Sequence, residues 1–312
     1  MENLILSINC VVPIFLTICV GMVVRRSGLV SRDTFQSLTR LCFHALLPAM
    51  MFNNVYSSGL DETGSPGWMV FLVAGLLVWF ALSWTVCTRV VEDRRRRGAY
   101  IQNMYRSNIA VIGVSLAQSM LDAAGVAMMT MAVAVLVPIY NVLAVIALES
   151  CRGEKIRGRE LVKDILKNPL ILATLLGLCF LTLEVPLPAC VRETVGNLGK
   201  AGSVLTLVAL GGSFRFDGVR ENCRRIGECA FLRLVFTPAV ALGAALALGF
   251  RHNALGVVLI CTATPMAATS YPMAVACDSD HQLTGQIVVT SSLLCCLTVF
   301  LWIFFLKQAG VL

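Results

Sequence analysis

The sequence predicts an all-α integral membrane protein whose ten transmembrane helices form two inverted five-helix repeats. Three observations support this prediction: an excess of apolar residues, basic clusters between long apolar stretches, and a polar interruption at the same place in each half. Of the 312 residues, 57% are hydrophobic and 14% are charged, and the mean hydropathy is +0.80. Because a soluble domain has roughly 25% charged residues, this composition excludes a soluble enzyme or a nucleic-acid binder and favours a chain that lies in lipid.

Ten stretches are apolar and long enough to cross a bilayer, for which a helix needs roughly 20 residues. Only Met1-Glu2-Asn3 precedes the first stretch, and Arg25 and Arg26 follow it, so we expect a true span and not a cleaved signal peptide. The expected spans are 4–24, 35–57, 68–90, 100–121, 123–148, 168–184, 191–214, 229–250, 254–276 and 283–306.

Most of the 25 Lys and Arg residues gather in four clusters between these stretches. Because basic connections favour the cytoplasmic side of a membrane, we expect all four clusters to be cytoplasmic anchors. The protein is then a multi-pass protein of the plasma or inner membrane with both termini outside. The clusters are Arg25, Arg26, Arg32 and Arg40; Arg89, Arg94 to Arg97 and Arg106; Arg152, Lys155, Arg157, Arg159, Lys163 and Lys167; and Arg215, Arg220, Arg224, Arg225 and Arg233.

The third basic cluster divides the chain into two parts of five spans each. The expected organisation is a first repeat over 1–149, a cytoplasmic basic linker over 150–167 and a second repeat over 168–312. The fourth span of each repeat carries a polar, helix-weakening stretch, at 106–115 and at 262–272. An odd number of spans per repeat gives the repeats opposite orientations, and inverted repeats with matching broken spans are typical of secondary transporters.

The proline residues of the second polar stretch favour a break in the helix. Pro265 and Pro272 each lack a backbone donor and clash with the preceding turn. Broken backbone at membrane depth is tolerated only where it is buried in protein or lines a cavity. The amino ends of half-helices there present free N–H groups and positive partial charge, which suit an anion.

Neutral polar residues near the breaks are candidates for substrate binding, because they add donors without burying a charge. Ser107, Asn108, Thr269 and Ser270 lie within the two polar stretches, and Asn141 lies inside the fifth span after Pro138. Lys200 in the seventh span is a candidate counter-charge, although its position favours snorkelling of its side chain to the outer interface.

The sequence also lacks features that other functions need. None of the 18 acidic residues falls in the middle of an expected span, whereas a cation exchanger needs carboxylates there. An anionic or neutral substrate is therefore favoured. The three histidines lie far apart, no HExxH or GxSxG motif occurs, and no Cys or His spacing suggests a metal site. We expect no enzyme activity, no catalytic residues, no metal and no cofactor.

Short segments spread over nearly the whole chain carry a family resemblance. They are Val12-Pro-Ile-Phe15, Gly21-Met-Val-Val-Arg-Arg-Ser-Gly-Leu29, Leu46-Leu-Pro-Ala-Met-Met-Phe52, Asn108-x4-Gly113, Tyr140-Asn141, Lys167-Asn-Pro-Leu170, Leu207-Val-Ala-Leu-Gly-Gly-Ser213 and Thr264-Pro-Met-Ala-Ala-Thr-Ser-Tyr271. In their order and spacing they resemble the auxin efflux carrier family, whose bacterial members include malate and malonate permeases.

The resemblance implies a fold shared with bile-acid symporters, in which the fourth and ninth of ten spans unwind and cross at the substrate site. Asn108 and Gly113 match the asparagine and glycine of the fourth-span crossover, and Pro265 matches the ninth-span proline. Thr269 stands where many relatives have asparagine, and Ser115 stands where plant carriers have proline. The chain lacks the long hydrophilic loop of many plant carriers, so auxin itself is not the expected cargo.

These inferences predict a secondary transporter that moves small organic anions, mono- or dicarboxylates, by elevator-like alternating access. Spans 1, 2, 6 and 7 are expected to form the scaffold against which spans 3–5 and 8–10 move. The expected partners are the organic anion and the lipid bilayer, with no nucleic acid, and a homodimer through the scaffold helices is a further expectation. The expected substrate-binding residues are Ser107, Asn108, Gly113, Asn141, Pro265, Thr269 and Ser270.

Two alternatives remain open at this point. A sodium-coupled bile-acid-type symporter would show sodium-dependent uptake. A membrane sensor or receptor that does not transport would bind its ligand without flux.

Overall fold

The computed structural model describes residues 2–57, 67–152, 158–216 and 218–312. Helices dominate this part of the chain, and no strand occurs in it. Four of its helices are long and apolar enough to cross a membrane: Gly67–Val90, Ala123–Ser150, Val219–Ala247 and His281–Gln308. The all-helical fold with apolar spans confirms the prediction of an all-α membrane protein.

Apolar side chains also cover outward-facing helix surfaces. On α4 (Gly67–Val90), Val70 and Val78 are more than half exposed, and on α9 (Pro169–Thr182) the same holds for Leu172 and Leu176. Contiguous apolar surface of this kind is rare on soluble monomers. Lipid chains, which are as apolar as leucine, cover such a surface at no cost.

The second apolar stretch folds as one helical run that contains a π-helical turn. α1 (Glu2–Arg26) ends at the first basic cluster and is followed by α2 (Arg32–Leu41), a π-helical turn (Cys42–Leu46) and α3 (Leu47–Tyr56). The π-helical turn lies directly before Pro48, whose missing N–H interrupts the regular hydrogen-bond ladder. The same arrangement recurs in α11 (Val219–Phe231), a π-helical turn (Leu232–Phe236) and α12 (Thr237–Ala247), before Pro238.

The chain leaves the helical conformation within both predicted polar stretches, at 106–108 and at 264–269. The α-helices around the two breaks have the same order and the same lengths of 12, 7 and 28 residues, and a π-helical turn follows the first break only. Around the first break they are α5 (Arg94–Tyr105), α6 (Val114–Met120, after the π-helical turn Ile109–Gly113) and α7 (Ala123–Ser150). Around the second they are α13 (His252–Ala263), α14 (Ser270–Ala276) and α15 (His281–Gln308).

The two broken segments run antiparallel, because the start of each contacts the far end of the other. At the start of α13, Asn253 Nδ2 donates to Asp122 Oδ1 at 2.7 Å, in the connection between α6 and α7. Near the start of α5, Arg95 forms an ion pair with Asp278 at 2.7 Å, in the connection between α14 and α15. The Gly125 backbone N–H and the Asn253 amide hold the pKa of the Asp122 carboxyl below its usual range.

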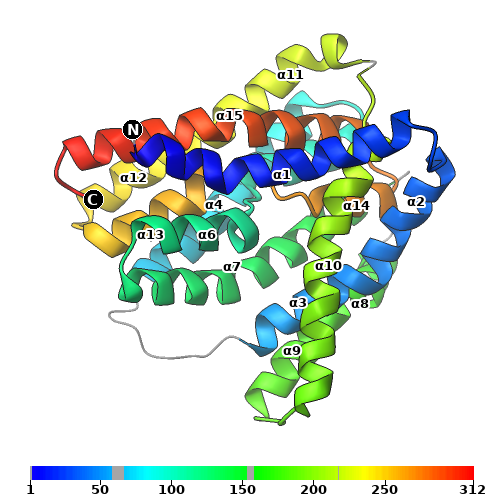
Figure 1. The fold of residues 1–312 in the computed structure, drawn as a ribbon, viewed down its shortest axis with the longest axis horizontal. Helices are drawn as coiled ribbons and strands as arrows, with labels where there is room; N and C mark the ends of the chain where they lie inside the picture. Colours follow the sequence, from blue (N-terminus) through cyan, green and yellow to red (C-terminus); the bar gives the residue numbers. More distant parts are fainter. Residues whose placement is uncertain (1, 58–66, 153–157, 217) are drawn as a thin grey trace.

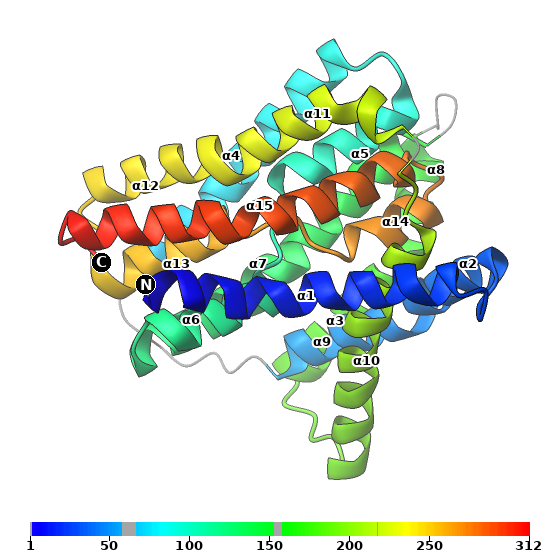
Figure 2. The same ribbon diagram turned by 45° about the horizontal axis from the view of Figure 1, so that its top comes forward.

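Of the remaining helices, α9 packs on α3, and α10 (Ala189–Ser213) packs on α1. α8 (Gly158–Lys167) and α9 are separated by Asn168, whose side chain caps α9 by accepting from the Leu170 N–H at 3.0 Å. α10 crosses α1 steeply, and α3, α9 and α10 protrude together from one side (Figures 1 and 2). Both termini lie at one end of the molecule, and α2, α8 and the start of α11 lie at the opposite end (Figure 2).

Candidate functional site

The two breaks meet each other in the interior of the protein. The Asn108 N–H donates to the Pro265 carbonyl at 2.9 Å. Ser107 Oγ donates to the Cys261 carbonyl at 2.8 Å and accepts from Thr264 Oγ1 at 3.1 Å. Since unpaired backbone groups cost several kcal/mol each in lipid, these reciprocal bonds explain how both interruptions persist at membrane depth.

A small cavity of about 30 Å³ lies at this crossing. That space suffices for a water molecule but not for an organic substrate, so the structure shows the cavity closed. Its walls come from α3, α7, α10 and the two breaks. The lining residues are Met50, Met51, Arg106, Ser107, Asn108, Ala110, Val111, Val137, Tyr140, Ser203, Leu207, Ala267, Ala268 and Thr269. We call this space the crossover cavity.

Arg106 is the charged group of the crossover cavity. Its side chain is buried, its Nη2 donates to Thr269 Oγ1 at 2.8 Å and to Asn141 Oδ1, and its Nη1 contacts Met273 Sδ at 2.7 Å. Within the part of the chain that the structure describes, no carboxylate pairs with this guanidinium. A buried charge whose only partners are neutral is costly, and an anion in the cavity would offset that cost.

The expectation that Arg106 and Arg233 are cytoplasmic anchors is wrong. They are 3% and 2% exposed and lie among the helices. The second cluster was defined by neighbourhood in sequence, but α5 carries Arg106 about 14 Å along the helix axis beyond Arg97. The crossover cavity therefore contains a buried charged group in addition to the predicted neutral donors. The available signal was that Arg106 opens the polar stretch that marks the break.

Arg233 donates hydrogen bonds to backbone carbonyls at the breaks and does not line the crossover cavity. Its guanidinium donates to the carbonyls of Tyr105, Cys261 and Thr264 at 3.2 to 3.3 Å. These carbonyls lie at the carboxyl ends of α5 and α13, which carry the negative end of the helix dipole and lack helical donors. Arg233 thus supplies both the missing donors and the compensating charge.

The structure brings most of the predicted site residues together. Ser107, Asn108 and Thr269 line the crossover cavity, and Asn141 contacts Arg106 from α7. Pro265 contributes the carbonyl that accepts from Asn108.

Asn141 and Pro265 contact residues of the cavity without lining it themselves, and three further predicted residues do not line it either. Ser270 is fully buried, and its carbonyl accepts from Gln102 Nε2 at 3.3 Å. Gly113 lets the helix pack closely, since a Cβ there would lie 2.9 Å from Met129 and 3.2 Å from Ile260. Lys200 is exposed on α10, so the structure does not bring it into the site.

An all-helical fold with apolar spans, and a buried polar site where two broken helices meet, define the class of membrane transporters. A family model described as Membrane transport protein matches residues 6–303. The chain belongs to this family, which is that of the auxin efflux carriers, and it is a transporter and not an enzyme. It is 21% identical over 303 residues to an uncharacterized transporter of Methanothermobacter thermautotrophicus. The aligned region covers 95% of this chain and 97% of the relative.

Proposed function

We propose that the protein is a secondary transporter that moves small organic anions, carboxylates in particular, across the cell membrane by alternating access. The observation that carries this proposal is the buried Arg106 guanidinium, which lines the crossover cavity without a carboxylate partner among the described residues. A substrate carboxylate would accept charge-assisted hydrogen bonds from Arg106, with Asn108 and Thr269 as neutral donors beside it.

We further propose that residues 1–149 and 168–312 are inverted five-helix repeats joined by the basic linker, with ten spans in all. The equal lengths of the α-helices around the breaks and their antiparallel course support this arrangement. The basic ends of the helices are assigned to the cytoplasm, because arginine-rich connections are retained on the cytoplasmic side. Both termini are then assigned to the outside.

The proposed movement is elevator-like. Met50 and Met51 of α3 and Ser203 and Leu207 of α10 wall the crossover cavity on the side of the scaffold, which is formed by α1 to α3, α9 and α10. The bonds between the breaks, such as Asn108 to Pro265, lie wholly inside the other group of helices. That group can therefore slide along the scaffold without breaking them, and the cavity would open first to one side and then to the other.

Arg233 favours this proposal over a sodium-coupled symporter. In other transporters, unwound carbonyls and half-helix carboxyl ends coordinate the coupling cation. Here the carbonyls of Tyr105, Cys261 and Thr264 already accept from a guanidinium. Because the Arg233 guanidinium already supplies a positive charge to these carbonyls, they need no sodium ion.

The test is uptake of a panel of labelled carboxylates into proteoliposomes, with and without imposed pH, sodium and voltage gradients. We expect uptake of at least one carboxylate, with no gain from a sodium gradient. Asn108→Leu should abolish uptake while the protein stays monodisperse, and Asn197→Leu, at an exposed position of α10, should leave uptake unchanged. The proposal would be contradicted if the Asn108→Leu variant showed wild-type uptake. It would also be contradicted if the native protein bound its ligand without flux.

A further inference from the structure

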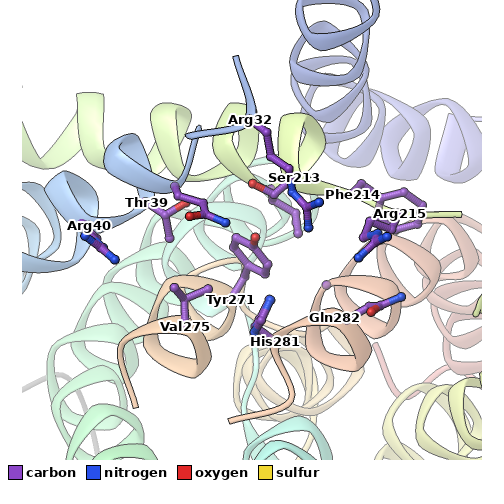
Figure 3. Close-up of a pocket in the computed structure, with 13 residues that line it drawn as sticks. Arg32, Thr39, Arg40, Ser213, Phe214, Arg215, Tyr271, Val275, His281 and Gln282 are labelled. Atoms are coloured by element: carbon purple, nitrogen blue, oxygen red, sulfur yellow. The ribbon is translucent and has the colours of Figure 1, made fainter. Parts of the chain in front are cut away.

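A second cavity, of about 180 Å³, lies at the arginine-rich end of the molecule. It is bounded by α2, the end of α10, α14 and α15, and it is much larger than the crossover cavity. Figure 3 shows the side chains of Arg32, Arg215 and His281 arranged around the space beside the Tyr271 ring. Arg40 lines the same space from α2. We call it the basic pocket.

Among the described residues, no carboxylate pairs with the arginines of the basic pocket. Three of its lining residues are arginines, and none of its described lining residues is acidic. In the part of the chain that the structure describes, Arg32, Arg40 and Arg215 form no ion pair with a carboxylate. Other arginines do form such pairs, namely Arg95, Arg96, Arg152 and Arg224. Several uncompensated guanidinium groups around one concave space focus a field that attracts an anion with more than one charge.

The position of the basic pocket relates it to the crossover cavity. The start of α14 contributes to both spaces, because Thr269 lines the crossover cavity and Tyr271 lines the basic pocket. The Tyr271 ring packs beside Gly285 of α15, where a Cβ would lie 3.4 Å from the ring, and edge-on to the His281 ring at 6.3 Å. The other walls of the basic pocket, α2 and α10, belong to the proposed scaffold. A shift of α14 and α15 against the scaffold would therefore reshape both spaces together.

We propose that the basic pocket is a second anion-binding site, which holds a small dianion such as a dicarboxylate at the arginine-rich mouth of the transport path. The inference that substrate occupies the basic pocket during transport rests on the proposed function. The binding of a dianion rests only on the geometry and charge of the pocket.

The test is equilibrium binding of radiolabelled succinate to the full-length protein in nanodiscs at low ionic strength, where exposed charges are least screened. Asn108→Leu disables the crossover cavity and should retain binding. The double variant Arg32→Gln/Arg215→Gln in that background should weaken binding by about a hundredfold or more, since each lost charged hydrogen bond weakens it about tenfold to a hundredfold. Arg220→Gln removes an exposed arginine of the same end that does not line the pocket, and it should retain binding.

Three results would overturn the proposal: no succinate binding to the Asn108→Leu protein, unchanged binding after the double substitution, or an equal loss with Arg220→Gln. The two proposals fail separately. If the native protein transports no carboxylate but the pocket variants still lose binding, the pocket stands and the proposed function falls. If Asn108→Leu abolishes both uptake and binding, the proposed function stands and the pocket falls.

Discussion

Arg106 and Arg233 are both buried guanidinium groups, and they differ in what they face. Arg233 donates to three backbone carbonyls, which are permanent partners. Arg106 has the neutral partners Asn141 and Thr269, and it lies on the wall of the crossover cavity. An anion bound in the cavity could therefore compensate its charge. Because a buried charge needs compensation, the first residue stabilises the fold and the second is suited to bind.

We predict that Arg106→Gln abolishes carboxylate uptake and that Arg106→Lys reduces it at least tenfold. Gln removes the charge, and an ammonium group lacks the planar fork that reaches Asn141 and Thr269 together. The measurement is initial uptake in proteoliposomes, normalised to monodisperse protein. Arg192→Gln, at an exposed position of α10, is the matched control. An Arg106→Gln variant with native KM would show that Arg106 does not contact the substrate.

The neutral members of the site were predictable from the sequence, and the charged one was not. Ser107, Asn108 and Thr269 stand out because they interrupt apolar stretches. Arg106 was assigned to a neighbouring cluster of arginines, since distance along the chain does not reveal depth in the membrane. Lys200 was a candidate only because of its own depth, and the face of α10 on which it lies depends on packing.

At the scale of elements, the contact between α1 and α10 depends on glycine. A Cβ at Gly21 would lie 2.1 Å from the Val208 carbonyl oxygen, and one at Gly211 would lie 2.0 Å from the Ile18 carbonyl oxygen. Both distances are far below any real contact, so the two backbones can approach this closely only where neither residue has a side chain. Small residues play this role at many helix crossings in membranes.

We predict that Gly211→Ala destabilises the protein by about 1–3 kcal/mol, the usual cost of forcing extra atoms into a packed interface. Gly243→Ala, on α12 with open space around it, should be neutral or stabilising by about 0.5–1 kcal/mol, because alanine restricts the unfolded chain. Thermal unfolding in detergent measures both variants. An unchanged Tm for Gly211→Ala would contradict the close packing of α1 on α10.

At the scale of the whole molecule, the described parts of the basic connections lie at the end opposite the two termini (Figures 1 and 2). This separation was expected from the positive-inside pattern. Arg106 and Arg233 are exceptions to it, because each lies among the helices.

We predict that a membrane-impermeant maleimide labels Cys190 but not Cys223 in intact cells, and labels both after permeabilisation. Both side chains are exposed. Cys190 lies in the first turn of α10, next to a connection assigned to the outside, and Cys223 lies among the arginines of α11. Peptide mapping by mass spectrometry identifies the labelled cysteines. Labelling of Cys223 alone in intact cells would reverse the proposed orientation.

The sequence by itself determined the membrane class, the order of the apolar stretches and the location of both breaks. These properties depend on local composition and on proline, so neighbouring residues suffice to predict them. Tertiary structure alone decided which side chains meet: Arg106 with Asn141 and Thr269, Arg233 with the ends of two half-helices, and the residues of the basic pocket. Arg32, Arg215 and His281 are far apart in the chain, and only the packing of α2, α10 and α15 places their side chains around one space.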